Sequence, residues 1–115
     1  MTPTLYGIKN CDTMKKARAW LDARGVAYAF HDYKASGIDR ATLAGWVAEH
    51  GWQTILNRAG TTFRKLPDAD REGIDEGRAI DLMLVQPSMI KRPILDVGVR
   101  TWVGFKPETF VAALG

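Results

Sequence analysis

The chain has 115 residues, a formal net charge of +3 at pH 7 and a pI of about 9.2. Hydrophobic residues make up 46% and charged residues 25%, which are values of a folded globular protein and exclude a disordered one. A single cysteine excludes a small scaffold held together by disulfides, and the length predicts one domain over residues 1–115.

The excess of positive charge is modest and scattered, which favours small anions as ligands over nucleic acid, for which a concentrated basic run is expected. No apolar stretch approaches the roughly 20 residues that cross a bilayer, so we expect no membrane partner. The first four residues lack the basic start and apolar run of a signal peptide. The sequence therefore predicts a cytoplasmic protein.

The first third of the chain predicts a strand, a helix and a second strand. Residues 4–8 are short and apolar enough for a buried strand, and Asp12 or Thr13 can cap the helix that follows. Ala17 and Leu21 recur at helical spacing, and Gly25 supplies a stop. Residues 27–33 then predict the second strand, with alternating aromatic side chains.

Helical patterns dominate residues 36–86, which we interpret as a helical insert within the domain. Asp39 can cap one helix that ends near Gly51, and Asp75 can cap another that stops before Pro87. The polar residues 57–62 predict a loop between them.

The last third predicts a hairpin of residues 94–97 and 100–103, followed by a helix that Pro107 opens. The predicted order is therefore β-α-β, helices, β-β-α.

Cys11 is placed between the first strand and the first helix, in a loop with polar neighbours. Unpaired N–H groups and the positive end of the helix dipole favour a thiolate at such a position, whereas Asp12 beside it acts against one. The alternative is a small buried hydrophobic residue, the commonest role of a free cysteine. Since there is no second cysteine, any redox cycle needs a thiol from another molecule.

A thiolate that attacks an oxyanion or a disulfide needs positive donors near it, and Arg58, Arg92 and Lys106 are the candidates. On sequence alone, an ordinary surface charge is the more frequent role of any one arginine. Pro93 after Arg92 forces a defined turn, for which a trans bond is favoured by general frequency and a cis bond is the alternative. We expect no metal site, because neither His31 nor His50 forms a pair with Cys11.

Five segments together resemble the arsenate reductase (ArsC) family, in particular its small YffB branch, and the related Spx regulators. The resemblance covers essentially the full length, and the order and spacing of the segments make it specific. They are Leu5-Tyr6; Cys11 with residues 16–21; Ile55-Leu56-Asn57-Arg58; Thr62-Phe63-Arg64-Lys65-Leu66; and residues 87–94 from Pro87 to Ile94.

This resemblance implies an α/β, thioredoxin-like fold with a mixed sheet and a helical insert. It implies Cys11 as nucleophile, Arg58, Arg92 and Lys106 as the surrounding positive groups, and a cis bond at Pro93. The family's arsenate reducers carry arginine where this chain has Lys106. For the YffB branch the suggested role is glutathione-dependent thiol reduction, with no tightly bound cofactor.

Two functional hypotheses follow. In the first, the protein is a thiol-dependent reductase of disulfides or small oxyanions, with glutathione or a glutaredoxin-like protein as thiol donor. We then expect Asn10, Asp12, Thr13 and Pro93 to contribute to the binding site for glutathione. In the second, the protein regulates RNA polymerase as Spx does, although Met14 replaces the second cysteine of the Spx Cys-x-x-Cys switch.

Overall fold

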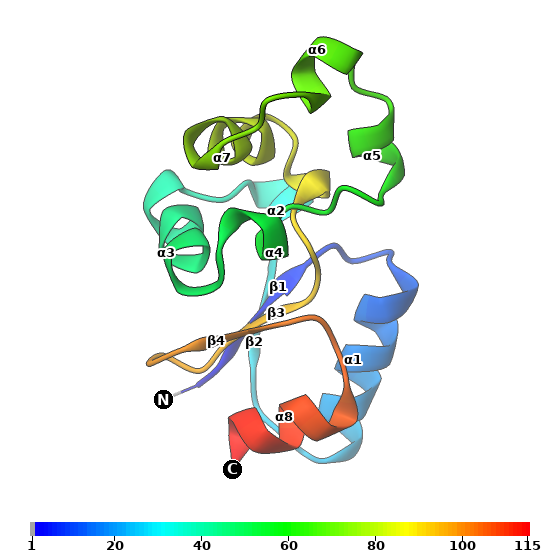
Figure 1. Ribbon diagram of the computed structural model, residues 1–115. Coiled ribbons are helices and arrows are strands. Elements are labelled where there is room, and N and C mark those ends of the chain that lie inside the picture. The colour runs from blue at the N-terminus through cyan, green and yellow to red at the C-terminus, as the bar shows by residue number, and fades with distance from the viewer. Residues whose placement is uncertain (1) are drawn as a thin grey trace. The chain divides into compact units, whose positions relative to one another are not determined.

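The computed structural model describes residues 2–115, which divide into two compact units. Residues 2–36 and 92–115 form the first unit, and residues 37–91 form the second (Figure 1). The second unit begins one residue after the expected start of the helical insert at residue 36 and extends past its expected end at residue 86. The organisation of residues 1–115 as a single domain stays a prediction, and Met1 lies outside the described residues.

The first unit contains a mixed four-stranded sheet. Its strands are β1 (Thr4–Gly7), β2 (Ala29–Asp32), β3 (Ile94–Asp96) and β4 (Thr101–Val103), in the order β2-β1-β3-β4. The pair β1 and β2 is parallel, whereas β1 with β3 and β3 with β4 are antiparallel. The predicted α/β fold with a mixed sheet is confirmed.

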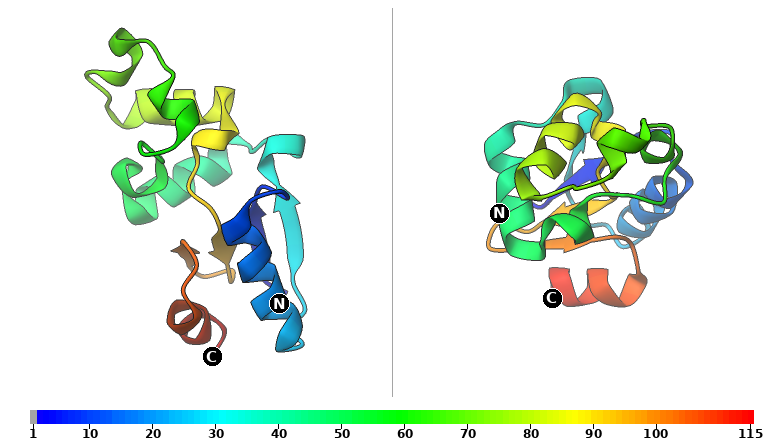
Figure 2. Two further views of the ribbon diagram at one scale, coloured as in Figure 1. Left: turned by 90° about the vertical axis from the view of Figure 1, so that its right-hand side faces the viewer. Right: turned by 45° about the horizontal axis from the view of Figure 1, so that its top comes forward.

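The helices of this unit are α1 (Asp12–Ala23), the single turn α2 (Tyr33–Ser36) and α8 (Pro107–Leu114). Leu5 and Leu95 are paired across β1 and β3, so both side chains lie on one face of the sheet. They form a buried core with α1 and α8, which Figure 2 shows packed beside the strands; its other members are Met14, Ala17, Leu21 and Phe110. This core fixes where the N-terminus of α1 lies relative to the strand ends.

Gly7 allows α1 to approach β1 closely. A Cβ atom at this position would overlap the end of the Met14 side chain, which is fully buried. Met14, which occupies the position of the second cysteine in a Cys-x-x-Cys motif, is therefore part of the core and packs directly against β1.

The second unit is helical. It contains α3 (Arg40–His50), α4 (Trp52–Ile55), α5 (Thr61–Arg64), α6 (Asp68–Arg71), α7 (Glu76–Val85) and the 3₁₀ turn η1 (Pro87–Met89). Its buried residues include Leu43, Trp46, Ile55 and Met83. The two predicted helices are confirmed as α3 and α7.

Several boundaries differ from the predictions. The second strand ends at Asp32 rather than residue 33, because Tyr33 already begins α2. The predicted loop over 57–62 is interrupted at Thr61, where α5 begins. Of the two caps predicted for the second unit, Asp75 accepts a hydrogen bond from the Arg78 N–H at 2.9 Å, whereas the Asp39 side chain makes no capping bond.

Candidate thiol site

Cys11 is the N-cap residue of α1. Its backbone is extended, and its carbonyl oxygen accepts the first helical hydrogen bond from the Lys15 N–H at 2.9 Å. The predicted cap at Asp12 or Thr13 is wrong, because Asp12 is already the first helical residue. The thiol therefore lies where the first N–H groups of the helix have no partner inside the helix.

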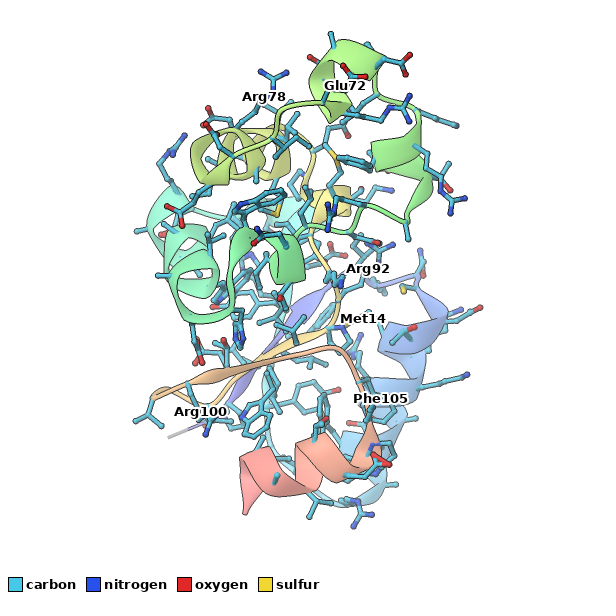
Figure 3. The ribbon with its side chains drawn as sticks, in the orientation of Figure 1. Met14, Glu72, Arg78, Arg92, Arg100 and Phe105 are labelled. Atoms are coloured by element: carbon cyan, nitrogen blue, oxygen red, sulfur yellow. The ribbon has the colours of Figure 1, made fainter. Side chains whose placement is uncertain are left out.

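Arg92 donates a hydrogen bond from Nε to the Cys11 Sγ, with a distance of 3.4 Å between the two atoms. Both side chains are half-buried. Arg92 precedes Pro93 at the start of the second segment of this unit, and Figure 3 shows it together with Met14 of α1. The two residues are 81 positions apart in the chain, so the fold creates this contact.

The Arg92–Pro93 peptide bond is cis, as the family resemblance implies and against the general preference for trans. The Pro93 carbonyl accepts a hydrogen bond from the Gly104 N–H at 2.8 Å, which ties the segment to the end of β4. Arg92 is thus held at its C-terminal side by the sheet.

The pKa of the Cys11 thiol is lower than its ordinary value. Burial is the largest single influence and raises it, but the backbone N–H groups of Met14 and Thr13 and the guanidinium of Arg92 together outweigh burial. Each of these donors interacts more strongly with the thiolate than with the neutral thiol. The geometry therefore favours a reactive thiolate over a buried, inert cysteine.

Sequence reasoning missed Tyr33, which is fully buried. Its hydroxyl oxygen accepts a hydrogen bond from the Arg92 guanidinium. Arg92 therefore contacts both the thiol of Cys11 and the phenol of Tyr33. Burial raises the pKa of the Tyr33 hydroxyl far above its usual range and keeps it neutral. The sequence alone held no signal for this contact, since residue 33 appeared as the end of a strand.

Asp32 is a second residue that sequence reasoning missed. Its carboxylate accepts hydrogen bonds from the backbone N–H of Lys9 at 3.1 Å, Lys34 at 2.9 Å and Ala35 at 3.1 Å. Burial is the largest single influence on the pKa of Asp32 and raises it, but these three donors and the nearby His31 together outweigh burial and lower the pKa. One carboxylate therefore connects the loop before Cys11 to the turn that carries Tyr33. An acidic residue at the end of a predicted strand was the available signal.

The remaining expected site residues are more dispersed. Asn10, Asp12 and Thr13 are exposed around the thiol loop, and the last of them contributes its backbone N–H to the sulfur. Lys106 is exposed at the N-cap of α8, and no hydrogen bond of the described chain joins it to Cys11. Arg58 belongs to the second unit, where its guanidinium lies 5.6 Å from the Trp52 ring centroid.

The charge of the chain is unevenly divided. The unit that carries Cys11 has nine lysine and arginine residues against five acidic ones, whereas the other unit has seven against eight. The thiol therefore belongs to the more positive of the two units, which favours negatively charged reactants.

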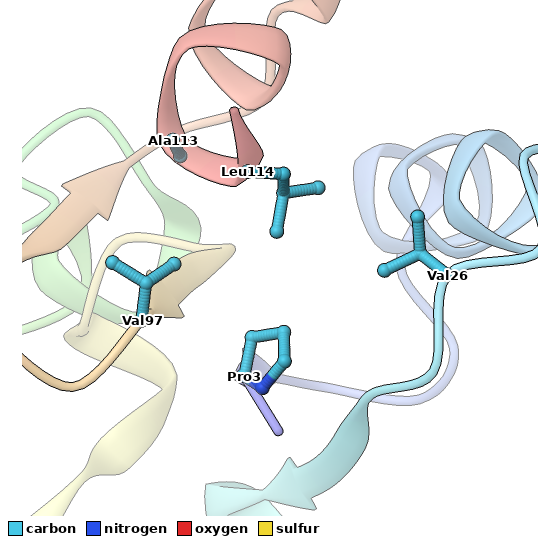
Figure 4. A pocket seen from close by; sticks show the side chains of 5 residues that line it. All are labelled: Pro3, Val26, Val97, Ala113 and Leu114. Carbon is cyan, nitrogen blue, oxygen red and sulfur yellow. The ribbon is translucent and has the colours of Figure 1, made fainter. Parts of the chain in front are cut away.

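Outside the thiol site, the described residues form an apolar pocket but no cluster of metal-binding side chains. A pocket of the first unit, away from the thiol, is lined by Pro3, Val26, Val97, Ala113 and Leu114, which are all apolar (Figure 4). Between residues 2 and 115, no group of three or more histidine, cysteine or acidic residues could hold a metal ion. Within the same range, no helix combines the length and the apolar character needed to span a membrane.

Comparison with known proteins places these observations in a family. A model of the ArsC family matches residues 6–113. A protein of Haemophilus influenzae described as uncharacterized is 36% identical over 110 residues, which are 96% of each chain. The global transcriptional regulator Spx of Streptococcus mutans is 30% identical over 113 residues, 96% of this chain and 82% of Spx.

Two solved structures are also similar. A YffB protein is 68% identical, with a TM-score of 0.96 and coverage of 99% of this chain and all of the other. An arsenate reductase (ArsC) related protein from Brucella melitensis is 54% identical, with a TM-score of 0.79 over 97% of this chain and 93% of the other. The family match spans nearly the whole chain and includes both Cys11 and Arg92. The chain belongs to the ArsC family.

Proposed function

We propose that the protein is a glutathione-dependent thiol reductase in which Cys11 is the nucleophile. The observation that carries this proposal is the Arg92 Nε donor 3.4 Å from a sulfur that caps α1. A thiolate stabilised in this way attacks disulfide sulfur without needing a separate base.

The reaction proceeds by two thiol exchanges. The Cys11 thiolate attacks the glutathionyl sulfur of a mixed disulfide, forms a bond with glutathione and releases the other partner as a thiolate, which takes up a proton. A second glutathione thiolate then attacks the mixed disulfide on Cys11, forms oxidised glutathione and returns Cys11 as thiolate. Each turnover converts one glutathionyl mixed disulfide and one glutathione thiol into one substrate thiol and one molecule of oxidised glutathione, so the cycle needs no bound cofactor.

The positive charge of the Cys11 unit supports an anionic thiol as the reactant, since glutathione carries two carboxylates. We assign Lys106 to one of these carboxylates, and the exposed loop of Asn10, Asp12 and Thr13, with Pro93, to the peptide backbone of glutathione. An oxyanion such as arsenate is the other substrate class that the same thiol and arginine groups suit.

The test is intact mass after exposure to oxidised glutathione, followed by a turnover assay. We expect wild-type protein to gain one glutathionyl group and Cys11→Ser to gain none. With a glutathione mixed disulfide of 2-mercaptoethanol as substrate, turnover coupled to glutathione reductase should require Cys11. Absence of both the adduct and turnover in the folded wild type would refute the proposal.

A second candidate function, transcriptional regulation in the manner of Spx, is favoured by the 30% identity to that regulator over 96% of the chain. In this case the partner is RNA polymerase, and the thiol contributes little. Purified polymerase should then bind wild type and Cys11→Ser with equal affinity. Failure of both proteins to bind would eliminate this candidate.

A further inference from the structure

A chain of contacts continues from the thiol into the interior of its unit. Arg92 donates to Cys11 through Nε, and the same guanidinium donates to the hydroxyl of Tyr33. Tyr33 is the first residue of α2 and directly follows β2, and its relative exposure is 0%. The guanidinium therefore donates hydrogen bonds to both a half-buried sulfur and a fully buried phenol.

An arginine side chain has several rotatable bonds, and fixing them costs conformational entropy. A rigid acceptor on the side away from the thiol limits the positions that the guanidinium can adopt before any reactant arrives. Tyr33 is suited to this role because its ring is held by burial and its position by the end of the strand.

The chemical nature of the acceptor also matters. A carboxylate in this place would neutralise Arg92 and compete with the thiolate, whereas a neutral phenol accepts the hydrogen bond and leaves the positive charge available. Burial keeps the pKa of Tyr33 too high for it to ionise. The charged groups that act on Tyr33 are Arg92, Cys11 and Asp32, and the carboxylate of the last already accepts three backbone N–H donors.

We propose that Tyr33 is a positioning residue, whose hydroxyl holds the Arg92 guanidinium against the Cys11 sulfur. The inference rests on the proposed function in taking Cys11 as the reactive thiol. It adds a residue that acts through Arg92 and does not itself touch the substrate.

The test is Tyr33→Phe, which removes only the hydroxyl. The rate of Cys11 alkylation by iodoacetamide is measured against pH in the full chain, and the midpoint should move to higher pH. Below the midpoint the rate should fall by up to about fivefold, as expected for the loss of one hydrogen bond to a neutral group. Tyr28→Phe is the matched control, because the Tyr28 hydroxyl accepts from Arg18 Nε at 3.2 Å. Its profile should equal that of wild type.

A double-mutant cycle separates positioning from a general structural effect. In an Arg92→Ala background, Tyr33→Phe should leave the alkylation profile unchanged, because the group that it positions is absent. An equal shift in both backgrounds, or no shift in either, would overturn the inference. Failure of the proposed function has a different signature, namely a wild type that takes up no glutathione or a profile insensitive to Arg92→Ala.

A measurement on the wild type covers the case in which Tyr33→Phe does not fold. With tyrosine labelled at the ring carbon that bears the hydroxyl, the Tyr33 resonance should follow the titration of Cys11 while the Tyr28 resonance does not. A Tyr33 signal indifferent to that titration would overturn the inference.

Discussion

Replacing Arg92 with alanine removes the one side-chain donor that lies beside the thiol in the described part of the chain. A hydrogen bond to a charged group contributes about 1.5–3 kcal/mol. Because Cys11 is half-buried and solvent screens the interaction, we take the lower end, about 1.5 kcal/mol. Since about 1.4 kcal/mol corresponds to a factor of ten, the thiolate population below the midpoint should fall roughly tenfold.

The assay is the rate of iodoacetamide alkylation as a function of pH, with circular dichroism to establish that each variant is folded. Arg100→Ala is the control, because Arg100 belongs to the same unit but lies 4.6 Å from the Trp102 ring centroid. Its profile should match wild type. A folded Arg92→Ala variant with the wild-type profile would refute the reasoning, because the N–H groups of α1 alone would then account for the lowered pKa of Cys11.

Three further predictions concern stability. The pKa of Cys11 is lowered on folding, so the thiolate contributes stability above the ordinary thiol pKa, and this stability is lost as the pH falls through the lowered value. In urea unfolding, the difference in free energy of unfolding between wild type and Cys11→Ser should therefore grow with pH across this window. A difference that does not change with pH would contradict this prediction. Asp75→Ala should lower the free energy of unfolding by about 1 kcal/mol, whereas Asp39→Ala, which removes no capping bond, should be nearly silent; equal losses would be inconsistent with the observed caps. Phe110→Ala should lower the free energy of unfolding by about 3–5 kcal/mol, measured by chemical denaturation, because this fully buried ring contacts two other aromatic rings edge-on. A decrease below about 1 kcal/mol would contradict the packing of this core.

Local sequence patterns predicted the elements that have strong hydrophobic periodicity or have glycine or proline at their ends. Two of the predicted helix ends lie at Gly25 and Gly51, which both have the positive φ that a residue after a helix often requires. Pro107 is the first residue of α8, as predicted. The four-residue helices of the second unit were not predicted, because a single turn has too few residues to show a period.

The thiol site was only partly predictable. Cys11 could be placed at the start of a helix because the strand before it and the helix after it both have clear local signals. The approach of Arg92 was suggested by family resemblance, and no local pattern encodes a contact between residues 81 positions apart. Tyr33 and Asp32 escaped notice because the hydrogen bonds from Arg92 to Tyr33 and from the Lys9 N–H to Asp32 join segments that are far apart in the chain.

The long separation between Cys11 and Arg92 also has a consequence during synthesis. The cysteine leaves the ribosome early, when the strand that places the arginine has not yet been made. Until Arg92 has been synthesised, the Cys11 sulfur has no guanidinium donor, and its pKa lies closer to that of a cysteine in an unfolded peptide. A nascent chain that ends before residue 92 therefore lacks one of the donors that lower the pKa of Cys11 in the folded protein.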